Sequence, residues 1–196
     1  MIVTKIEQLS KLKYKISIDG EFAFVLYKSE LSRYRLRENE EITQTVLEDI
    51  KQTVLLKRAK QKSLDLLKDM NRTEHELMMK LKFHQYPEDI ISKAIAYVKS
   101  FHYIDDERYI ENYIRSKSGI KSKKEIESLL YAKGLRKEMV QMAFEKEEEY
   151  DEISAIQSLL KKRRYSSENA DYKEMQKTYA YLMRKGFSYE NIRQVL

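Results

Sequence analysis

The chain of 196 residues is 36% charged, well above the roughly 25% of an ordinary soluble domain, and its formal net charge at pH 7 is +6. No stretch approaches the roughly 20 continuous apolar residues of a membrane span, and the first residues lack the pattern of a signal peptide, so we expect a cytoplasmic protein. The absence of cysteine excludes disulfides, thiolate metal sites and thiol nucleophiles, while the scarcity of glycine (4) and proline (1) favours long, solvated helices.

Residues 1–44 are predicted to form a small β-hairpin extension. Apolar and polar residues alternate on both sides of Asp19-Gly20, and the apolar members are Tyr14, Ile16, Ile18, Phe22, Phe24 and Leu26. Asp-Gly favours the positive φ angles of a two-residue type I′ turn, and the period of two places the apolar residues on one face. The segment from Ile2 to Leu9 supplies a candidate third strand. Because a lone hairpin is marginally stable in water, its apolar face must pack against the segment from Ser29 to Leu36 or against a partner protein, and we interpret it as a small cap on the helical body.

From Thr45 onward, the apolar residues recur at helical spacing. Thr45 and Glu48 are predicted to form a capping box at the start of a helix that extends to about Met70, with an apolar stripe of Val46, Ile50, Val54, Leu55, Ala59, Leu64 and Leu67. Thr73 and Glu76 repeat this start signal. Further signals mark the later helices: Pro87 in a first turn, Asp105 and the pair of Ser122 and Glu125 at N-termini, and Gly134 as a left-handed C-terminal cap.

The helical part of the chain contains internal repeats. A series of apolar positions recurs 49 positions later, as from Leu81 to Leu130, and a series that contains a glycine recurs 52 positions after that, as from Gly134 to Gly186. Such series indicate tandem units that bury their faces against their neighbours. We therefore predict a mainly α fold, in which tandem three-helix repeats form an elongated, curved array. The predicted domains are the N-terminal β-hairpin extension at 1–44 and three-helix repeats at 45–103, 104–150 and 151–196.

The sequence lacks the usual motifs of enzymes. It contains no Gly-x-x-x-x-Gly-Lys phosphate loop, no Gly-x-Ser-x-Gly nucleophile elbow and no Rossmann glycine pattern, so a phosphate-handling enzyme has no supporting motif. Asp105, Asp106 and Glu107 could form a carboxylate cluster, but their place at a helix start favours capping and interaction with the helix dipole. The three histidines are too far apart in the repeat pattern for a metal site. We expect no catalytic residue, no metal and no cofactor.

Motifs in two of the repeats resemble those of a known family. The first repeat contains Arg72-Thr73-Glu74-His75-Glu76-Leu77, and the second contains Ile104-Asp105-Asp106-Glu107-Arg108-Tyr109 and, further on, Lys133-Gly134-Leu135. The order and spacing of these motifs resemble the RecX family of RecA modulators over about residues 45–196. Gln85 departs from the glycine often found at the first corner in that family, and the third repeat is degenerate.

The resemblance implies a regulatory protein and not an enzyme. A RecX-like protein binds the RecA nucleoprotein filament and modulates, chiefly by inhibition, its ATPase and strand-exchange activities in recombination and DNA repair. The expected partner is the RecA filament, with single- or double-stranded DNA as a second candidate; we expect a monomer that does not contact membranes. An alternative is a stand-alone helix-turn-helix DNA-binding regulator built on the Leu130–Phe144 region, whose second helix offers Arg136, Lys137 and Gln141 to DNA bases.

Charge is unevenly distributed along the second half of the chain. Residues 115–137 hold eight basic residues against two acidic ones, whereas 138–152 hold seven acidic residues, with Glu147, Glu148 and Glu149 among them, against one lysine. Such runs form either a solvated helix surface or a surface that binds a charged partner. The candidate RecA-binding or DNA-binding residues are Arg72, Arg115, Lys117, Lys121, Lys123, Lys124, Lys161, Lys162, Arg163 and Arg164.

Overall fold

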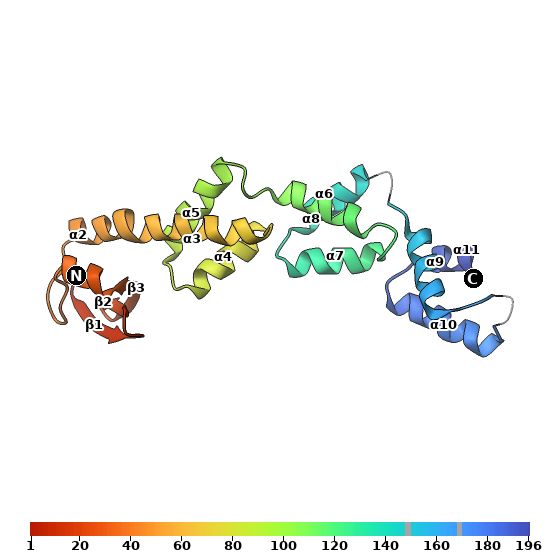
Figure 1. The fold of residues 1–196 in the computed structure, drawn as a ribbon, viewed down its shortest axis with the longest axis horizontal. Coiled ribbons are helices and arrows are strands. Elements are labelled where there is room, and N and C mark those ends of the chain that lie inside the picture. Colours follow the sequence, from red (N-terminus) through yellow and green to blue (C-terminus); the bar gives the residue numbers. More distant parts are fainter. Residues whose placement is uncertain (148–149, 168–169) are drawn as a thin grey trace. The chain divides into compact units, whose positions relative to one another are not determined.

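The structure, a computed structural model, describes residues 1–147, 150–167 and 170–196. It is mainly helical, with one small antiparallel sheet near the N-terminus, which confirms the predicted fold class (Figure 1). The chain divides into two compact units, Met1–Ile104 and Asp105–Leu196. Within the described ranges, no helix has the length and apolar character needed to cross a membrane.

The N-terminal sheet has three antiparallel strands in the order β1-β2-β3: β1 (Val3–Gln8), β2 (Lys13–Ile18) and β3 (Glu21–Tyr27). The turn between β2 and β3 has φ angles of 49° at Asp19 and 87° at Gly20, both positive as a type I′ turn requires. These observations confirm the predicted hairpin and its third strand.

The apolar face of the sheet packs within its own unit. Ile16, Phe24 and Leu26 are fully buried and share one core with residues of the following helices, such as Ile50 and Leu77. The short helix α1 (Lys28–Arg33) also contacts the sheet. Of the two expected packing partners, the sheet therefore uses the Ser29–Leu36 segment, and it uses the helical body of the first unit as well.

Phe22 does not share the buried face, contrary to the prediction. Its exposed fraction is 43%, and its ring lies 5.4 Å from the Lys15 Nζ. The reason is an irregularity in the register: Ile16 lies opposite Phe24, but Ser17 lies opposite Phe22. A bulge of this kind inserts one extra residue into a strand and turns the side chains beyond it away from the regular alternation.

One long helical segment follows the sheet. It consists of α2 (Gln44–Asp49), the π-helical turn η1 (Ile50–Leu55) and α3 (Leu56–Asp69). Its N-cap is Thr43, whose hydroxyl accepts a 3.3 Å hydrogen bond from the Val46 N–H, so the predicted capping box of Thr45 with Glu48 is wrong by two residues. The wider π turn accounts for the irregular spacing of the apolar stripe, because it keeps Ile50, Val54, Leu55 and Ala59 buried.

The remaining helices follow the repeat pattern. They are α4 (Glu74–Phe83), α5 (Glu88–Ser100), α6 (Asp106–Lys117), α7 (Lys123–Ala132), α8 (Lys137–Lys146), α9 (Glu152–Arg163), α10 (Tyr172–Arg184) and α11 (Tyr189–Val195). The bounds of α4 and α7 differ by 49 positions at both ends, and α8 and α11 begin 52 positions apart. The corner after α4, α7 and α10 has a left-handed residue each time: Gln85 (φ 61°), Gly134 (φ 78°) and Gly186 (φ 91°).

The predicted helix starts at Thr73, Asp105 and Ser122 are confirmed, whereas Pro87, expected in a first turn, is the N-cap of α5. Thr73 and Glu76 form a reciprocal capping box with two 3.1 Å hydrogen bonds. The Asp105 carboxylate accepts a 3.0 Å hydrogen bond from the Arg108 N–H, so it caps α6 as expected. Ser122 caps α7 through its hydroxyl, which accepts a 3.1 Å hydrogen bond from the Glu125 N–H.

Candidate functional site

Two of the five basic candidates in the second repeat already have carboxylate partners. The Arg115 Nε lies 2.9 Å from an oxygen of Glu147, whose side chain is only 12% exposed, and the Lys121 Nζ pairs with Glu125. Glu147 of the acidic run thus neutralises Arg115, and Glu125, within the basic run itself, neutralises Lys121. Glu148 and Glu149, the other members of the expected acidic cluster, lie outside the described residues.

The side chains of the other three candidates of this repeat have no carboxylate partner among the described residues. Lys117 lies 5.8 Å from the ring of Tyr113, and Lys123 lies 5.0 Å from the ring of Phe144. Lys123 and Lys124 are exposed and occupy the first two positions of α7. Cations at a helix N-terminus oppose the helix dipole, so this pair, which we call the α7 lysine pair, does not stabilise its own helix.

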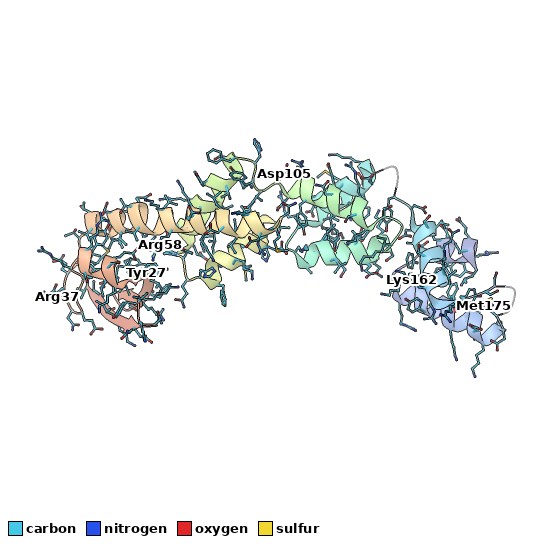
Figure 2. All side chains as sticks on the ribbon, viewed as in Figure 1. Tyr27, Arg37, Arg58, Asp105, Lys162 and Met175 are labelled. Atoms are coloured by element: carbon cyan, nitrogen blue, oxygen red, sulfur yellow. The ribbon has the colours of Figure 1, made fainter. Side chains whose placement is uncertain are left out.

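The four basic candidates of the third repeat lie at the opposite end of a helix. Lys161, Lys162 and Arg163 form the last turn of α9, and Arg164 is its left-handed C-cap. Lys162 is labelled on α9 in Figure 2. All four are exposed, and the Arg163 guanidinium lies 4.3 Å from the ring of Tyr181. Because cations at a helix C-terminus interact favourably with the dipole, this cluster has a structural explanation that the α7 lysine pair lacks.

Arg72 has a role within the first unit. Its Nε donates a 3.1 Å hydrogen bond to the carbonyl of Leu66, in the last turn of α3, and the side chain is half-buried. A carbonyl there has no partner within its own helix. Arg72 therefore helps to close α3, and part of its donor capacity is already used.

A polar junction between the second and third repeats was not predicted. The Glu152 carboxylate accepts 2.6 Å hydrogen bonds from the backbone N–H of Lys123 and from the side-chain amide of Asn191. The hydroxyl of Ser122, which is buried, donates a 2.6 Å bond to the Lys185 carbonyl. The sequence indicated Ser122 only as a helix cap and Glu152 only as part of the acidic run at 138–152, because their bonding partners lie far along the chain.

Tyr150 lies beside this junction, at the end of the second repeat. Its hydroxyl donates a 2.9 Å hydrogen bond to the Lys121 carbonyl. Burial, together with the nearby carboxylates of Glu152, Glu127 and Glu125, raises the pKa of Tyr150 above its ordinary value. The phenol therefore keeps its proton and remains a donor well above neutral pH.

Replacing Glu152 with alanine is expected to lower the free energy of unfolding by about 1–3 kcal/mol, because two donors lose a charged acceptor. Thermal unfolding measures the loss, and faster hydrogen exchange at the Lys123 amide would locate it. Glu190→Ala is the matched control, since Glu190 is exposed in the first turn of α11. Equal effects of the two changes would show that the junction contributes nothing beyond helix-dipole interactions.

The described residues contain no group of three or more histidine, aspartate or glutamate side chains placed to hold a metal ion.

Comparisons with known proteins agree with the repeat architecture. A family model described as RecX, third three-helix domain, matches residues 149–196. The Regulatory protein RecX of Clostridium beijerinckii is 29% identical over 100% of this chain and 93% of its own length. The Regulatory protein RecX of Caldanaerobacter subterraneus subsp. tengcongensis is also 29% identical, over 100% of this chain and 98% of its own length. Over its whole length, the chain is therefore similar to RecX regulatory proteins.

Solved RecX structures have a fold similar to that of this chain. The crystal structure of RecX from Lactobacillus salivarius is 27% identical, with a TM-score of 0.60 over 71% of this chain and 93% of that one. A second crystal structure of a regulatory protein RecX is 24% identical, with a TM-score of 0.63 over 99% of this chain and 98% of that one, and shows the fold alone. The RecX relatives are named as regulatory proteins and not as enzymes.

Proposed function

We propose that this RecX-like protein binds the RecA filament and lowers its ATP hydrolysis and strand exchange, and that it has no enzymatic activity of its own. The similarity to RecX proteins supports a regulatory role. The α7 lysine pair is the observation that supports a contact with a charged partner. Its two exposed side chains have no carboxylate partner in the described ranges, and their charges oppose the dipole of their own helix. An anionic partner would offset this unfavourable interaction with the helix dipole.

The proposed contact surface is narrower than the full set of candidates. Its centre is the α7 lysine pair with Lys117, and the basic end of α9 is a second element of the same unit. Arg115 and Lys121 position this surface through their ion pairs. The anion is either an acidic group of RecA or a phosphate of the DNA in the filament. We further propose that residues 45–103, 104–150 and 151–196 act as three successive domains.

The direct test is the rate of ATP hydrolysis by RecA on single-stranded DNA, with and without this protein. Substoichiometric protein added to preformed filaments is expected to slow hydrolysis or strand exchange. An unchanged rate at saturating protein, with no co-sedimentation with filaments, would contradict the proposal. Sequence-specific binding to duplex DNA without RecA would instead favour a helix-turn-helix regulator that uses α7 and α8.

Neutralising the α7 lysine pair by Lys123→Gln and Lys124→Gln is expected to weaken binding to RecA–DNA filaments. If phosphates are contacted, the slope of log affinity against log salt should fall by nearly one unit per lost contact. The melting temperature should barely change, because exposed charges contribute within about 0.5 kcal/mol to folding. Filament co-sedimentation across a salt series measures both quantities.

A matched control removes the same charge elsewhere in the second unit. Lys173→Gln and Lys177→Gln change two exposed lysines of α10 and should leave binding nearly intact. Equal losses from both double variants would show that net charge, and not the α7 lysine pair, governs binding.

A further inference from the structure

The first unit contains a small basic pocket that plays no part in the proposed surface. Its volume is about 160 Å³, and it lies between β2, β3, α3 and the corner after α4. The side chains that give it its chemistry are Lys13, Tyr27, Arg58, Lys62, His84 and Tyr86. This volume is below the roughly 300–1,000 Å³ of sites for drug-sized ligands, so the pocket suits a small group.

Arg58 forms the fixed wall of this pocket. Its Nη2 donates a 2.7 Å hydrogen bond to the Val25 carbonyl, and its Nη1 lies 3.2 Å from a carboxylate oxygen of Glu30. The guanidinium also lies 4.9 Å from the centre of the Tyr27 ring, and the two side chains lie close together in Figure 2. The buried Arg58 Nε has no hydrogen-bond partner among the described residues. These contacts hold the guanidinium in one place, and Glu30 balances its charge.

The two lysines of the pocket are not balanced in this way. Lys13 lies 5.7 Å from the centre of the Tyr27 ring, and neither Lys13 nor Lys62 has a carboxylate partner within the described ranges. Burial and the positive charges of Lys62, Lys13 and Lys80 lower the pKa of His84 below its ordinary value. The histidine at the rim therefore experiences a positive potential that the protein itself does not neutralise.

The corner residue of the first repeat differs from those of the other two repeats. Gly134 and Gly186 occupy the equivalent corners in the other repeats, but here Gln85 adopts the left-handed conformation, at φ 61°. Left-handed backbone is unfavourable for residues other than glycine, and such strain is concentrated at functional sites. Gln85 is one of the residues that line the basic pocket.

We propose that this pocket binds a phosphate group, held by Lys13, Lys62 and the imidazole of His84. Lysine presents up to three N–H donors and no acceptor, and the neutral imidazole of His84 adds one donor, which matches an anion with several acceptor oxygens. The phosphate is either a backbone phosphodiester of a nucleic acid or a free ion. The pocket lies in the first unit, so the inference is independent of the α7 lysine pair in the second.

The test follows the imidazole of His84 and the Nε–H of Arg58 by NMR in the full chain. Titration with inorganic phosphate is expected to shift both signals and to raise the pKa of His84, because a bound anion offsets the nearby positive charges. A separate titration with a short single-stranded oligonucleotide identifies the source. If the signals move at a lower concentration of oligonucleotide than of inorganic phosphate, the site binds a nucleic-acid backbone. If they move only with inorganic phosphate, the site binds the free ion.

The double variant Lys13→Gln and Lys62→Gln is expected to weaken phosphate binding at least about tenfold, since two charged donors are lost. Without phosphate, the His84 pKa should already be higher than in the unmodified protein. Lys57→Gln with Lys68→Gln, two exposed lysines of α3 outside the pocket, should bind phosphate normally. The proposal is overturned if neither probe moves the His84 and Arg58 signals, or if the two double variants respond alike. RecA ATPase inhibition by the same variants reports separately on the proposed function.

Discussion

Leu130→Ala is expected to lower the free energy of unfolding by about 2–5 kcal/mol, the usual cost of truncating a buried leucine when the core cannot fully collapse around the cavity. Leu130 lies on α7, is completely inaccessible to solvent, and shares the core of the second repeat with residues of all three of its helices, among them Ile110, Ile126 and Val140. Chemical denaturation monitored by circular dichroism measures the loss.

The preceding residue provides the control on the same helix. Leu129 is 36% exposed, and Leu129→Ala should cost less than about 1 kcal/mol. Both changes alter helix propensity equally, so the difference isolates burial. A similar loss from the two variants would contradict the packing of α7 and the repeat register that places Leu130 in the core.

Gly186→Ala is expected to cost about 2–4 kcal/mol, from left-handed strain together with a clash at the junction of the second and third repeats. Gly186 has φ +91°, and a Cβ there would lie 2.9 Å from the Ser122 hydroxyl and 3.0 Å from the Lys124 Cβ. The hydroxyl cannot move away without losing its 2.6 Å hydrogen bond to the Lys185 carbonyl. Denaturation gives the total cost, and hydrogen exchange in α7 and α10 shows whether the junction has opened.

Gly20→Ala separates the two contributions. Gly20 has a nearly identical φ of +87°, but no atom lies within 4 Å of the position that a Cβ would take. This change should therefore cost only the left-handed strain, about 1–2 kcal/mol. If Gly186→Ala lowers the free energy of unfolding no more than Gly20→Ala does, the close approach at the junction does not contribute to the cost.

Local signals predicted local structure well. Asp19-Gly20 determines its own turn, and Thr73, Asp105 and Ser122 cap helices through bonds to residues three positions on. The repeat shifts were equally informative, because the corners at Gly134 and Gly186 need a backbone conformation that glycine adopts at little cost.

The errors have a common cause in packing that a local pattern does not encode. A bulge in the sheet exposes Phe22, and a π turn alters the spacing of the stripe after Thr43. The candidate site illustrates the same limit. Charge composition identified Arg115 as basic, but its partner Glu147 lies 32 positions away, so the sequence could not separate engaged charges from available ones.

The junction also bears on how proteins of this kind can diverge. Several of its bonds use backbone atoms, such as the Lys123 N–H and the Lys185 carbonyl, while the side chains of these residues are free to differ. Any residue except proline supplies the same N–H at position 123. Substitutions at position 123 can therefore change the surface charge without breaking the junction between the repeats. The preference for a partner can then evolve independently of the architecture.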